Sequence, residues 1–184
     1  EYAIERNADI LLEAEHLKKI EYTLVNQVDV TGYPSMEEVK ILKKDFPNAE
    51  IEYFPLYFFP VLNKKIETRQ REGILFVGGF AHTPNQDAAI WLVKDILPVL
   101  RERGIKDKVY LVGSNPTDQI LALQDQDVIV TGYVTDDDLQ TYYEKCFVDI
   151  LPLRYGAGMK GKVLEAMYNG IPTVTTTIGA EGLY

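Results

Sequence analysis

The sequence predicts an α/β fold whose main part is a doubly wound parallel sheet, and three observations support this. Short apolar runs recur after residue 72, and such runs are typical of strands buried on both faces of a parallel sheet. Glycines follow several of these runs, and segments with helix signals separate them. The predicted strands are 74–77, 109–112, 128–130, 147–151 and 173–177.

The segments between these strands carry the signals that begin helices. Thr83 is predicted to cap a helix that has Pro84 in its first turn, runs to about residue 103 and bends at Pro98. Thr135 is predicted to cap a second helix, because the aspartates that follow it suit the helix dipole. The other two predicted helices are 120–123 and 160–169.

A shorter α/β pattern precedes this region. We predict a polar helix over 2–24, a strand at 28–30, a helix capped by Ser35 and a strand at 49–54. A charged stretch then predicts a linker. The expected parts are an incomplete N-terminal α/β segment over 1–60, a linker over 61–72, and a sheet domain over 73–184 that is cut short at its C-terminal end.

The charge balance limits the classes of partner. The formal net charge is -9, so the chain lacks the positive field of a nucleic-acid-binding protein, and we expect no nucleic-acid partner. Cys146 is the single cysteine, which excludes an internal disulfide and suits a reducing compartment. No apolar run approaches the roughly 20 residues that cross a bilayer. We therefore expect a cytoplasmic location.

Glycines lie where the predicted strands end, and parallel sheets of this kind bind ligands at those ends. Gly78 and Gly79 follow the first strand, and Gly132 follows the third. A glycine-rich turn over 154–162 leads from the fourth strand into a helix, whose free amides favour an anion. Its glycines are Gly156, Gly158 and Gly161, and its cations are Arg154, Lys160 and Lys162. This pattern predicts a phosphate site; the alternative is a set of tight turns with solvated cations.

Glu165 lies one turn into the helix that follows the glycine-rich turn. A carboxylate at this position can accept two hydrogen bonds from the neighbouring hydroxyls of a ribose. The alternative is a glutamate on the helix surface, which is the commoner case.

These residues also carry a resemblance to a known family. The stretches 152–167, 170–176 and 178–183 are similar to the signature of glycosyltransferase family 4, also called glycosyl transferases group 1. Residues 76–88 resemble the first loop of the same domain in one branch of that family. The resemblance implies half of a GT-B fold, in which two Rossmann-like domains face a cleft. Residues 1–60 resemble, more weakly, the end of the family's acceptor domain.

The resemblance implies transfer of a sugar from a nucleotide-diphosphate donor to a glycan, lipid or small-molecule acceptor, without a metal or other cofactor. It implies that Glu165 binds the donor ribose and that Tyr133 and Val134 form the nucleobase loop. The resemblance implies no particular catalytic residue. It implies that any contact with the inner face of a membrane would come from the acceptor domain, most of which we expect to be missing from this sequence. The donor-binding residues that we expect are Gly78, Gly79, Gly132, Tyr133, Val134, Arg154, Gly158, Met159, Lys160, Gly161, Lys162 and Glu165.

The sequence departs from the family pattern at three positions. Ala157 stands where the family has the first glutamate of its motif, so the donor sugar is not implied. Gly79 and Asn85 stand where many members have an arginine and a lysine that bind the diphosphate. We therefore expect one or more of the three cations in the glycine-rich turn to supply this charge.

Three other functions stay open from the sequence alone. A nucleotide-sugar epimerase or a phosphorylase can share the two-domain fold. A non-catalytic interaction module could use the aromatic stretch 53–59 as its partner surface. A dinucleotide oxidoreductase fits less well, because Gly78-Gly79 lacks the G-x-G-x-x-G spacing and the second strand ends in Gly113-Ser114 rather than an acid.

Because most of the acceptor domain is expected to be missing, we predict that the isolated chain binds nucleotides weakly and transfers no sugar. A thermal-shift panel of nucleoside diphosphates and nucleotide sugars, followed by a transfer assay, measures both properties. Robust sugar transfer by the isolated chain would contradict this expectation.

Overall fold

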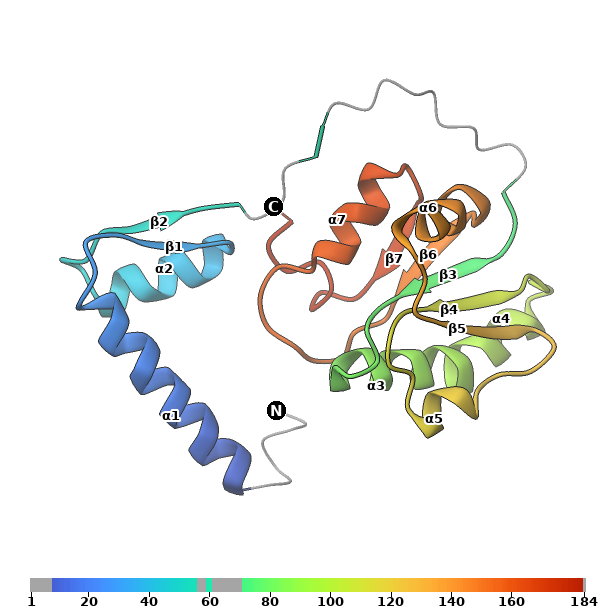
Figure 1. Ribbon diagram of the computed structural model, residues 1–184, viewed down its shortest axis with the longest axis horizontal. Helices are drawn as coiled ribbons and strands as arrows, with labels where there is room; N and C mark the ends of the chain where they lie inside the picture. Colours follow the sequence, from blue (N-terminus) through green and yellow to red (C-terminus); the bar gives the residue numbers. More distant parts are fainter. Residues whose placement is uncertain (1–7, 56–58, 61–70, 184) are drawn as a thin grey trace.

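The computed structural model describes residues 8–55, 59–60 and 71–183. Within these residues, five strands form a parallel sheet in the order β5-β4-β3-β6-β7 (Figure 1). The strands are β3 (Ile74–Val77), β4 (Val109–Val112), β5 (Val128–Gly132), β6 (Val148–Leu151) and β7 (Thr173–Thr175). The predicted Rossmann-like, doubly wound α/β sheet is therefore confirmed.

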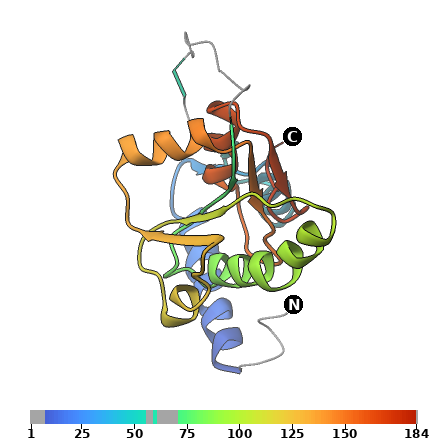
Figure 2. The same ribbon diagram turned by 90° about the vertical axis from the view of Figure 1, so that its right-hand side faces the viewer.

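Helices cover both faces of this sheet (Figures 1 and 2). Successive residues of β3 point to opposite faces, so Phe76 packs in one core cluster and Leu75 in the other. The Phe76 cluster includes side chains from α3 (Thr83–Trp91), α4 (Leu97–Glu102) and α5 (Asp118–Leu121). The Leu75 cluster includes side chains from α6 (Asp136–Lys145) and α7 (Gly161–Tyr168). Burial on both sides explains why these strands are apolar along their whole length.

The start of α3 differs from the prediction. Thr83 is the first helical residue, and His82 takes the cap position without a side-chain capping bond. Gln86, three residues after Thr83, makes no capping box with it. Its side-chain amide donates instead to the carbonyl of Phe80 at 2.7 Å, which ties the helix to the loop before it.

The bend predicted at Pro98 takes the form of a π-helical segment, Leu92–Ile96, between α3 and α4. Proline has no amide hydrogen and so cannot continue the regular ladder of hydrogen bonds, and bends of this kind are found at proline and at π-bulges.

The N-terminal part has a small core of its own. Its elements are α1 (Ala8–Val25), β1 (Thr31–Tyr33), α2 (Met36–Asp45) and β2 (Ile51–Tyr53), and β1 pairs with β2 in parallel. The predicted cap is present, since Ser35 Oγ accepts from the amide of Glu38 at 3.4 Å. The strand predicted at 28–30 is wrong. The amides of Gln27 and Val28 both donate to the carbonyl of Leu24, so the chain turns there and β1 begins later.

Two residues at the ends of the predicted linker contact the sheet domain, Phe59 just before it and Arg71 within it, while 61–70 lie outside the described residues. The Arg71 guanidinium donates to the carbonyls of Asn169 and Gly170, which follow α7. The Phe59 ring stacks on Tyr168 at the end of the same helix, with 4.6 Å between ring centroids.

Among the described residues, no helix combines the length and the apolar character that a membrane span requires.

The ends of β3 and β4 approach closely because Gly113 has no side chain. The amide of Gly78 donates to Val112 at 2.9 Å, and the amide of Gly113 donates to Gly132 at 3.2 Å. A Cβ atom on Gly113 would lie 2.7 Å from the carbonyl carbon of Gly78 and would overlap its oxygen. The backbone cannot yield there without opening the sheet at the edge where ligands bind.

We predict that Gly113→Ala lowers the free energy of unfolding by about 1–3 kcal/mol, the usual cost of overpacking. Urea denaturation measures this difference. Gly79→Ala is the matched control, because its new Cβ would meet Ser114 Oγ at an ordinary 3.6 Å. Equal stability of the two variants would show that the close approach is not a constraint.

Candidate functional site

The candidate site lies at the edge of the sheet where the strand order reverses. The chain adds β4 and β5 on one side of β3 and then returns to add β6 and β7 on the other side (Figure 1). Ligands of doubly wound sheets bind at such a point, beyond the carboxyl ends of the strands. The first loop begins at Gly78 after β3, and the glycine-rich turn follows β6. The fold therefore brings together the two segments that the sequence singled out.

A buried asparagine connects these two segments. Asn85, in the first turn of α3, is 6% exposed. Its side-chain nitrogen donates to the carbonyl of Gly79 at 2.8 Å, and its side-chain oxygen accepts from Lys162 Nζ. A Cβ on Gly78 would lie 3.2 Å from Lys162 Nζ, so the ammonium lies beside the first loop. Asn85, Lys162 and the two glycines form one cluster across the reversal point.

The other two cations of the turn already have carboxylate partners. Arg154 makes a two-bond ion pair with Asp87 of α3, with Nε 2.8 Å from Oδ2, and its guanidinium stands over the Trp91 ring. Lys160 Nζ lies 3.3 Å from Glu181 Oε2 and also donates to the carbonyl of Gly158. These pairs hold the turn to α3 and to the C-terminal segment.

Asp149 on β6 is a fully buried carboxyl that the sequence analysis assigned no role. Neither of its oxygens has a hydrogen-bond partner among the described residues. Burial raises the pKa of Asp149 to about 8, and the charge of Lys162 opposes this rise. Burial lowers the pKa of Lys162 to about 8, Asp149 opposes that change, and Lys160 adds to it. The signal in the sequence that could have identified Asp149 is an acidic residue within an otherwise apolar strand, because such residues are seldom buried.

Glu165 is half-buried on α7 rather than freely solvated. Burial raises the pKa of its carboxyl, and Asp136 adds to the rise. The hydroxyl of Tyr143, a buried residue of α6, partly offsets it. Glu165 is therefore partly shielded from water and lies close enough to Tyr143 of α6 for that hydroxyl to affect its pKa.

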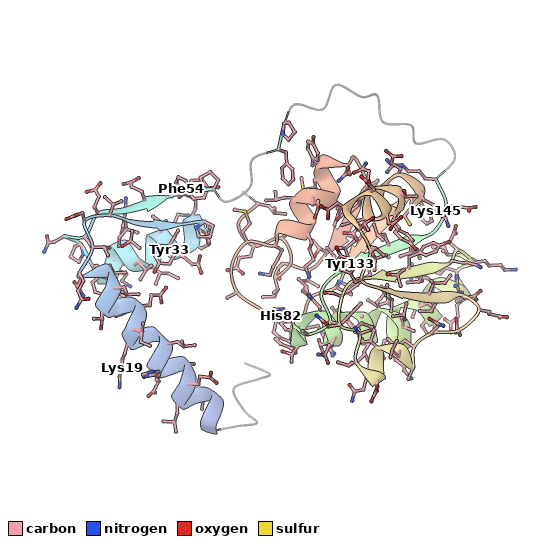
Figure 3. All side chains as sticks on the ribbon, in the orientation of Figure 1. Lys19, Tyr33, Phe54, His82, Tyr133 and Lys145 are labelled. Atoms are coloured by element: carbon pink, nitrogen blue, oxygen red, sulfur yellow. The ribbon has the colours of Figure 1, made fainter. Side chains whose placement is uncertain are left out.

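The loop after β5 exposes an aromatic ring. Gly132 has a φ of 71°, a conformation that glycine adopts without strain, and it turns the chain away from the sheet. Tyr133 is 77% exposed, so its ring is not part of a packed core. Val134 packs against the Leu75 core cluster and anchors the loop. Figure 3 labels Tyr133 here and His82 in the first loop.

The glycine-rich turn reaches α7 without a side-chain cap. Gly156 and Gly158 have φ values of 124° and 75°. Helix α7 begins at Gly161, and the side chain of Lys160, at the N-cap position, makes no capping hydrogen bond. A Cβ on Gly182 would lie 3.4 Å from Met159, so Met159 lies against the C-terminal segment. The first amides of α7 are therefore left for water or a ligand.

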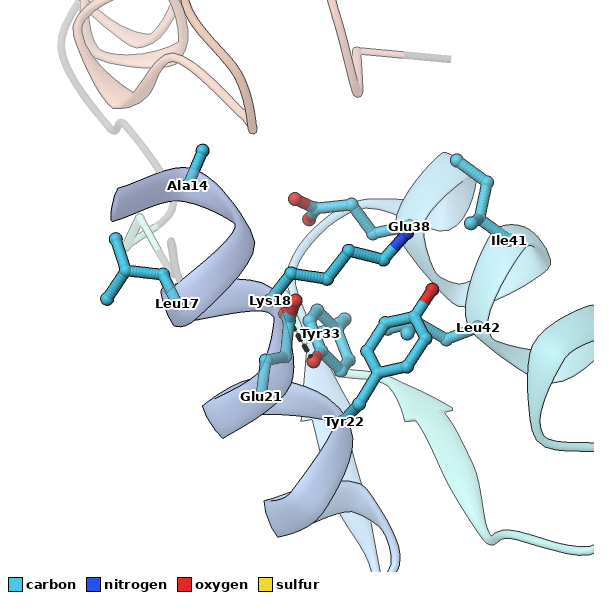
Figure 4. A pocket seen from close by; sticks show the side chains of 9 residues that line it. All are labelled: Ala14, Leu17, Lys18, Glu21, Tyr22, Tyr33, Glu38, Ile41 and Leu42. Carbon is cyan, nitrogen blue, oxygen red and sulfur yellow. Dashed lines mark hydrogen bonds between the residues drawn. The ribbon is translucent and has the colours of Figure 1, made fainter. Parts of the chain in front are cut away.

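A pocket in the N-terminal part was not foreseen from the sequence (Figure 4). It lies between α1 and α2, and the Tyr33 hydroxyl donates to Glu21 at 2.7 Å on its wall. Its lining residues are Ala14, Leu17, Lys18, Glu21, Tyr22, Tyr33, Glu38, Ile41 and Leu42.

Within the described ranges, no three histidine, cysteine or carboxylate side chains converge as metal ligands would.

A sequence model of the family described as Glycosyl transferases group 1 matches residues 71–183. The chain belongs to this family. The matched range holds the first loop, the glycine-rich turn and α7, so the resemblance that the sequence motifs carried is confirmed.

Parts of this chain are also similar to individual proteins. An uncharacterized 44.6 kDa protein in the cps region of Klebsiella pneumoniae is 29% identical over 116 residues, which are 59% of this chain and 30% of that protein. The structure of a mutant of S. aureus TarM with fondaparinux, alpha-GlcNAc-glycerol and UDP has a TM-score of 0.67 at 17% identity, covering 84% of this chain and 31% of that chain.

Sucrose-phosphate synthase from Thermosynechococcus elongatus has a TM-score of 0.60 at 18% identity, covering 88% of this chain and 44% of that chain. The chain thus spans less than half the length of each of these proteins. At these identities the solved structures establish the shared fold.

Asp149 predicts a pH dependence of stability. The folded state keeps a proton on this carboxyl up to about pH 8, whereas the unfolded chain releases it near its ordinary value of 3.8. The protein should therefore lose stability as the pH rises between these values. Asp149→Asn removes the titrating group. The difference in free energy of unfolding between this variant and the wild type should therefore shift by a few kcal/mol in favour of the variant between about pH 5 and about pH 8. Urea denaturation at both pH values measures the gain, with the exposed Asp95→Asn as control.

Proposed function

We propose that the full protein is a glycosyltransferase that moves a sugar from a nucleoside-diphosphate sugar to an acceptor, and that the sheet edge between β3 and β6 binds the donor. One observation carries this proposal. In a chain of the glycosyl transferases group 1 family, the first loop and the glycine-rich turn meet at the reversal of strand order and are joined through Asn85 and Lys162.

The chemistry requires stabilisation of the leaving diphosphate. Negative charge builds on its oxygens as the bond to the sugar breaks, and fixed dipoles and cations lower the energy of that state. The uncapped amides of α7 and a nearby lysine can supply this stabilisation. A Cβ atom on Gly158 would meet no atom within 4 Å, so phosphate oxygens have room to reach the backbone there. The proposal therefore includes no metal ion.

The nucleoside half of the donor fits the loops beside this point. We place the ribose at Glu165, whose carboxylate accepts from two neighbouring hydroxyls, and the base against the exposed ring of Tyr133. UDP is the first nucleotide to test, because the TarM structure contains it.

The acceptor belongs on the side of the N-terminal part. Glu38, at the start of α2, lies within electrostatic range of Glu181 and Lys160. Burial raises the pKa of Glu38, Glu181 adds to this rise, and Lys160 opposes it. The N-terminal part thus approaches the domain that we assign to the donor at the glycine-rich turn, where a glycan, lipid or small-molecule acceptor would meet the donor sugar.

Titration calorimetry of the full protein with UDP, GDP, ADP and TDP tests the proposal. We expect one of these to bind, and Glu165→Ala to weaken that binding by about 10- to 100-fold, because hydrogen bonds to a charged acceptor are lost. Binding of inorganic pyrophosphate should be unchanged, since it has no ribose. Glu102→Ala, an exposed glutamate on α4, is the control. If the protein binds none of the four nucleotides, the proposed function is wrong.

A further inference from the structure

We propose that the C-terminal end of α7 is a docking surface for both ends of the linker, and that Phe59 and Arg71 hold the N-terminal part in position there. The consequence of this docking rests on the proposed function, because α7 is the helix whose first amides we assign to the donor. The part on which we expect the acceptor is then tethered to the helix that begins at the donor site.

The N-terminal part and the sheet domain have separate cores. The small cluster of the N-terminal part consists of side chains between Val25 and Ile51. Both clusters of the sheet domain consist of side chains from Ile74 onwards. Among the described residues, no buried cluster contains side chains from both parts. Two such parts move relative to each other unless contacts outside their cores prevent it.

The guanidinium of Arg71 lies at the C-terminal end of α7. Its Nη1 atom donates to the carbonyl of Gly170 at 3.1 Å, and its Nη2 atom donates to the carbonyl of Asn169 at 3.4 Å. The last carbonyls of a helix have no partner within the helix and carry a partial negative charge, which favours a cation. The last turn of α7 contains no basic residue of its own. Arg71 therefore supplies this cation from the linker and fixes where the linker meets the sheet domain.

Phe59 brings the other end of the linker to the same place. Its ring stacks on that of Tyr168, the last residue of α7, with 4.6 Å between centroids and an angle of 18° between the ring planes. The next two residues, Asn169 and Gly170, are those whose carbonyls accept from Arg71. Residues on either side of 61–70 are thus bound to three consecutive residues at one helix end.

The end of α7 is a fixed support. The side-chain amide of Asn169 donates to the carbonyl of Glu165 at 2.9 Å. The backbone amide of Ile171 donates to the carbonyl of Ala166 at 3.1 Å, and the side chain of Ile171 is buried in the Leu75 core cluster. These bonds complete the helix end and attach it to the sheet. A group that docks here therefore keeps a constant position relative to the first turn of α7.

The docking can also be released without unfolding either part. Phe59 is 40% exposed, and one stacked ring pair is weak compared with a large apolar interface between domains. Glu38 approaches the pair of Lys160 and Glu181, but Glu181 repels its carboxylate while Lys160 attracts it, so this approach adds little net attraction. Removal of a single ring or guanidinium should therefore change how the two parts are held.

The first experiment measures distances between the two parts by pulsed electron paramagnetic resonance. Spin labels are attached at the exposed positions of Lys19→Cys in α1 and Lys94→Cys in the π-helical segment. The full protein is used, with exposed native cysteines replaced by serine, while Cys146 is buried and remains. This labelled background should give one narrow distribution of distances. A broad distribution in it would overturn the docking.

Phe59→Ala and Arg71→Ala should each make this distribution at least about twice as wide, because a linker without fixed ends lets the two parts sample many relative positions. Phe59→Tyr keeps the stacked ring and should leave the distribution narrow. A narrow distribution in Phe59→Ala or in Arg71→Ala would overturn the docking, whatever the stability of the variant.

Each of the two residues has a matched control. Phe54→Ala removes an exposed ring that lies beside Gly32 within the N-terminal part. Arg101→Ala removes a guanidinium that donates to the carbonyl of Ile105 at 2.8 Å within the sheet domain. Both controls should keep the narrow distribution. Equal broadening in the controls would show a general loss of structure and would overturn the specific roles of Phe59 and Arg71.

Nucleotide binding separates this role from that of the donor site. In titration calorimetry of the full protein, Phe59→Ala and Arg71→Ala should bind UDP within about twofold of the wild type, because the proposed donor contacts lie at the other end of α7. A larger loss would show that the two residues maintain the donor site itself and would overturn their positioning role. If the wild type binds no nucleoside diphosphate, the proposed function is wrong, whereas the spin-label distances still decide the docking.

Discussion

The contact between Lys162 and Asn85 is the interaction on which the candidate site depends, because it joins the two halves of the sheet domain. Asn85 belongs to the helix that follows β3, and Lys162 belongs to the helix that follows β6. The two strands are neighbours, and the strand order reverses between them. A buried amide that contacts both a loop carbonyl and an ammonium fixes the distance between these helices. The glycines of both segments therefore face one space.

This arrangement also explains how a chain with a net charge of -9 can present a positive site. Its overall field repels an anion, so attraction has to be local. Arg154 and Lys160 are paired with carboxylates and shape the turn. Lys162 faces a neutral amide instead, and the uncapped start of α7 adds its partial positive charge. Shape and charge are thus supplied by different cations of the same short segment.

The sequence predicted the sheet well, because strands such as β3 are buried on both faces and so are apolar at every position. It misplaced β1, because hydrogen bonds at the end of α1 set where the chain turns. For the candidate site, the glycines and Glu165 were singled out from their spacing, and their roles in binding stay predictions. The partners of the cations could not be found in this way, since Arg154 and Asp87 are 67 residues apart and pair only through the fold.

The position of Lys162, which contacts the first loop from α7, has a physical consequence. A lysine on an exposed loop keeps its water and its charge at all ordinary pH values. Lys162 reaches the first loop from a helix, and its partial burial removes water from the ammonium and lowers its pKa to about 8. An ionised Asp149 opposes this lowering, and burial in the sheet raises the pKa of Asp149 itself to about 8. The ammonium beside Gly78 therefore loses its proton at a lower pH than the ammonium of an exposed lysine does.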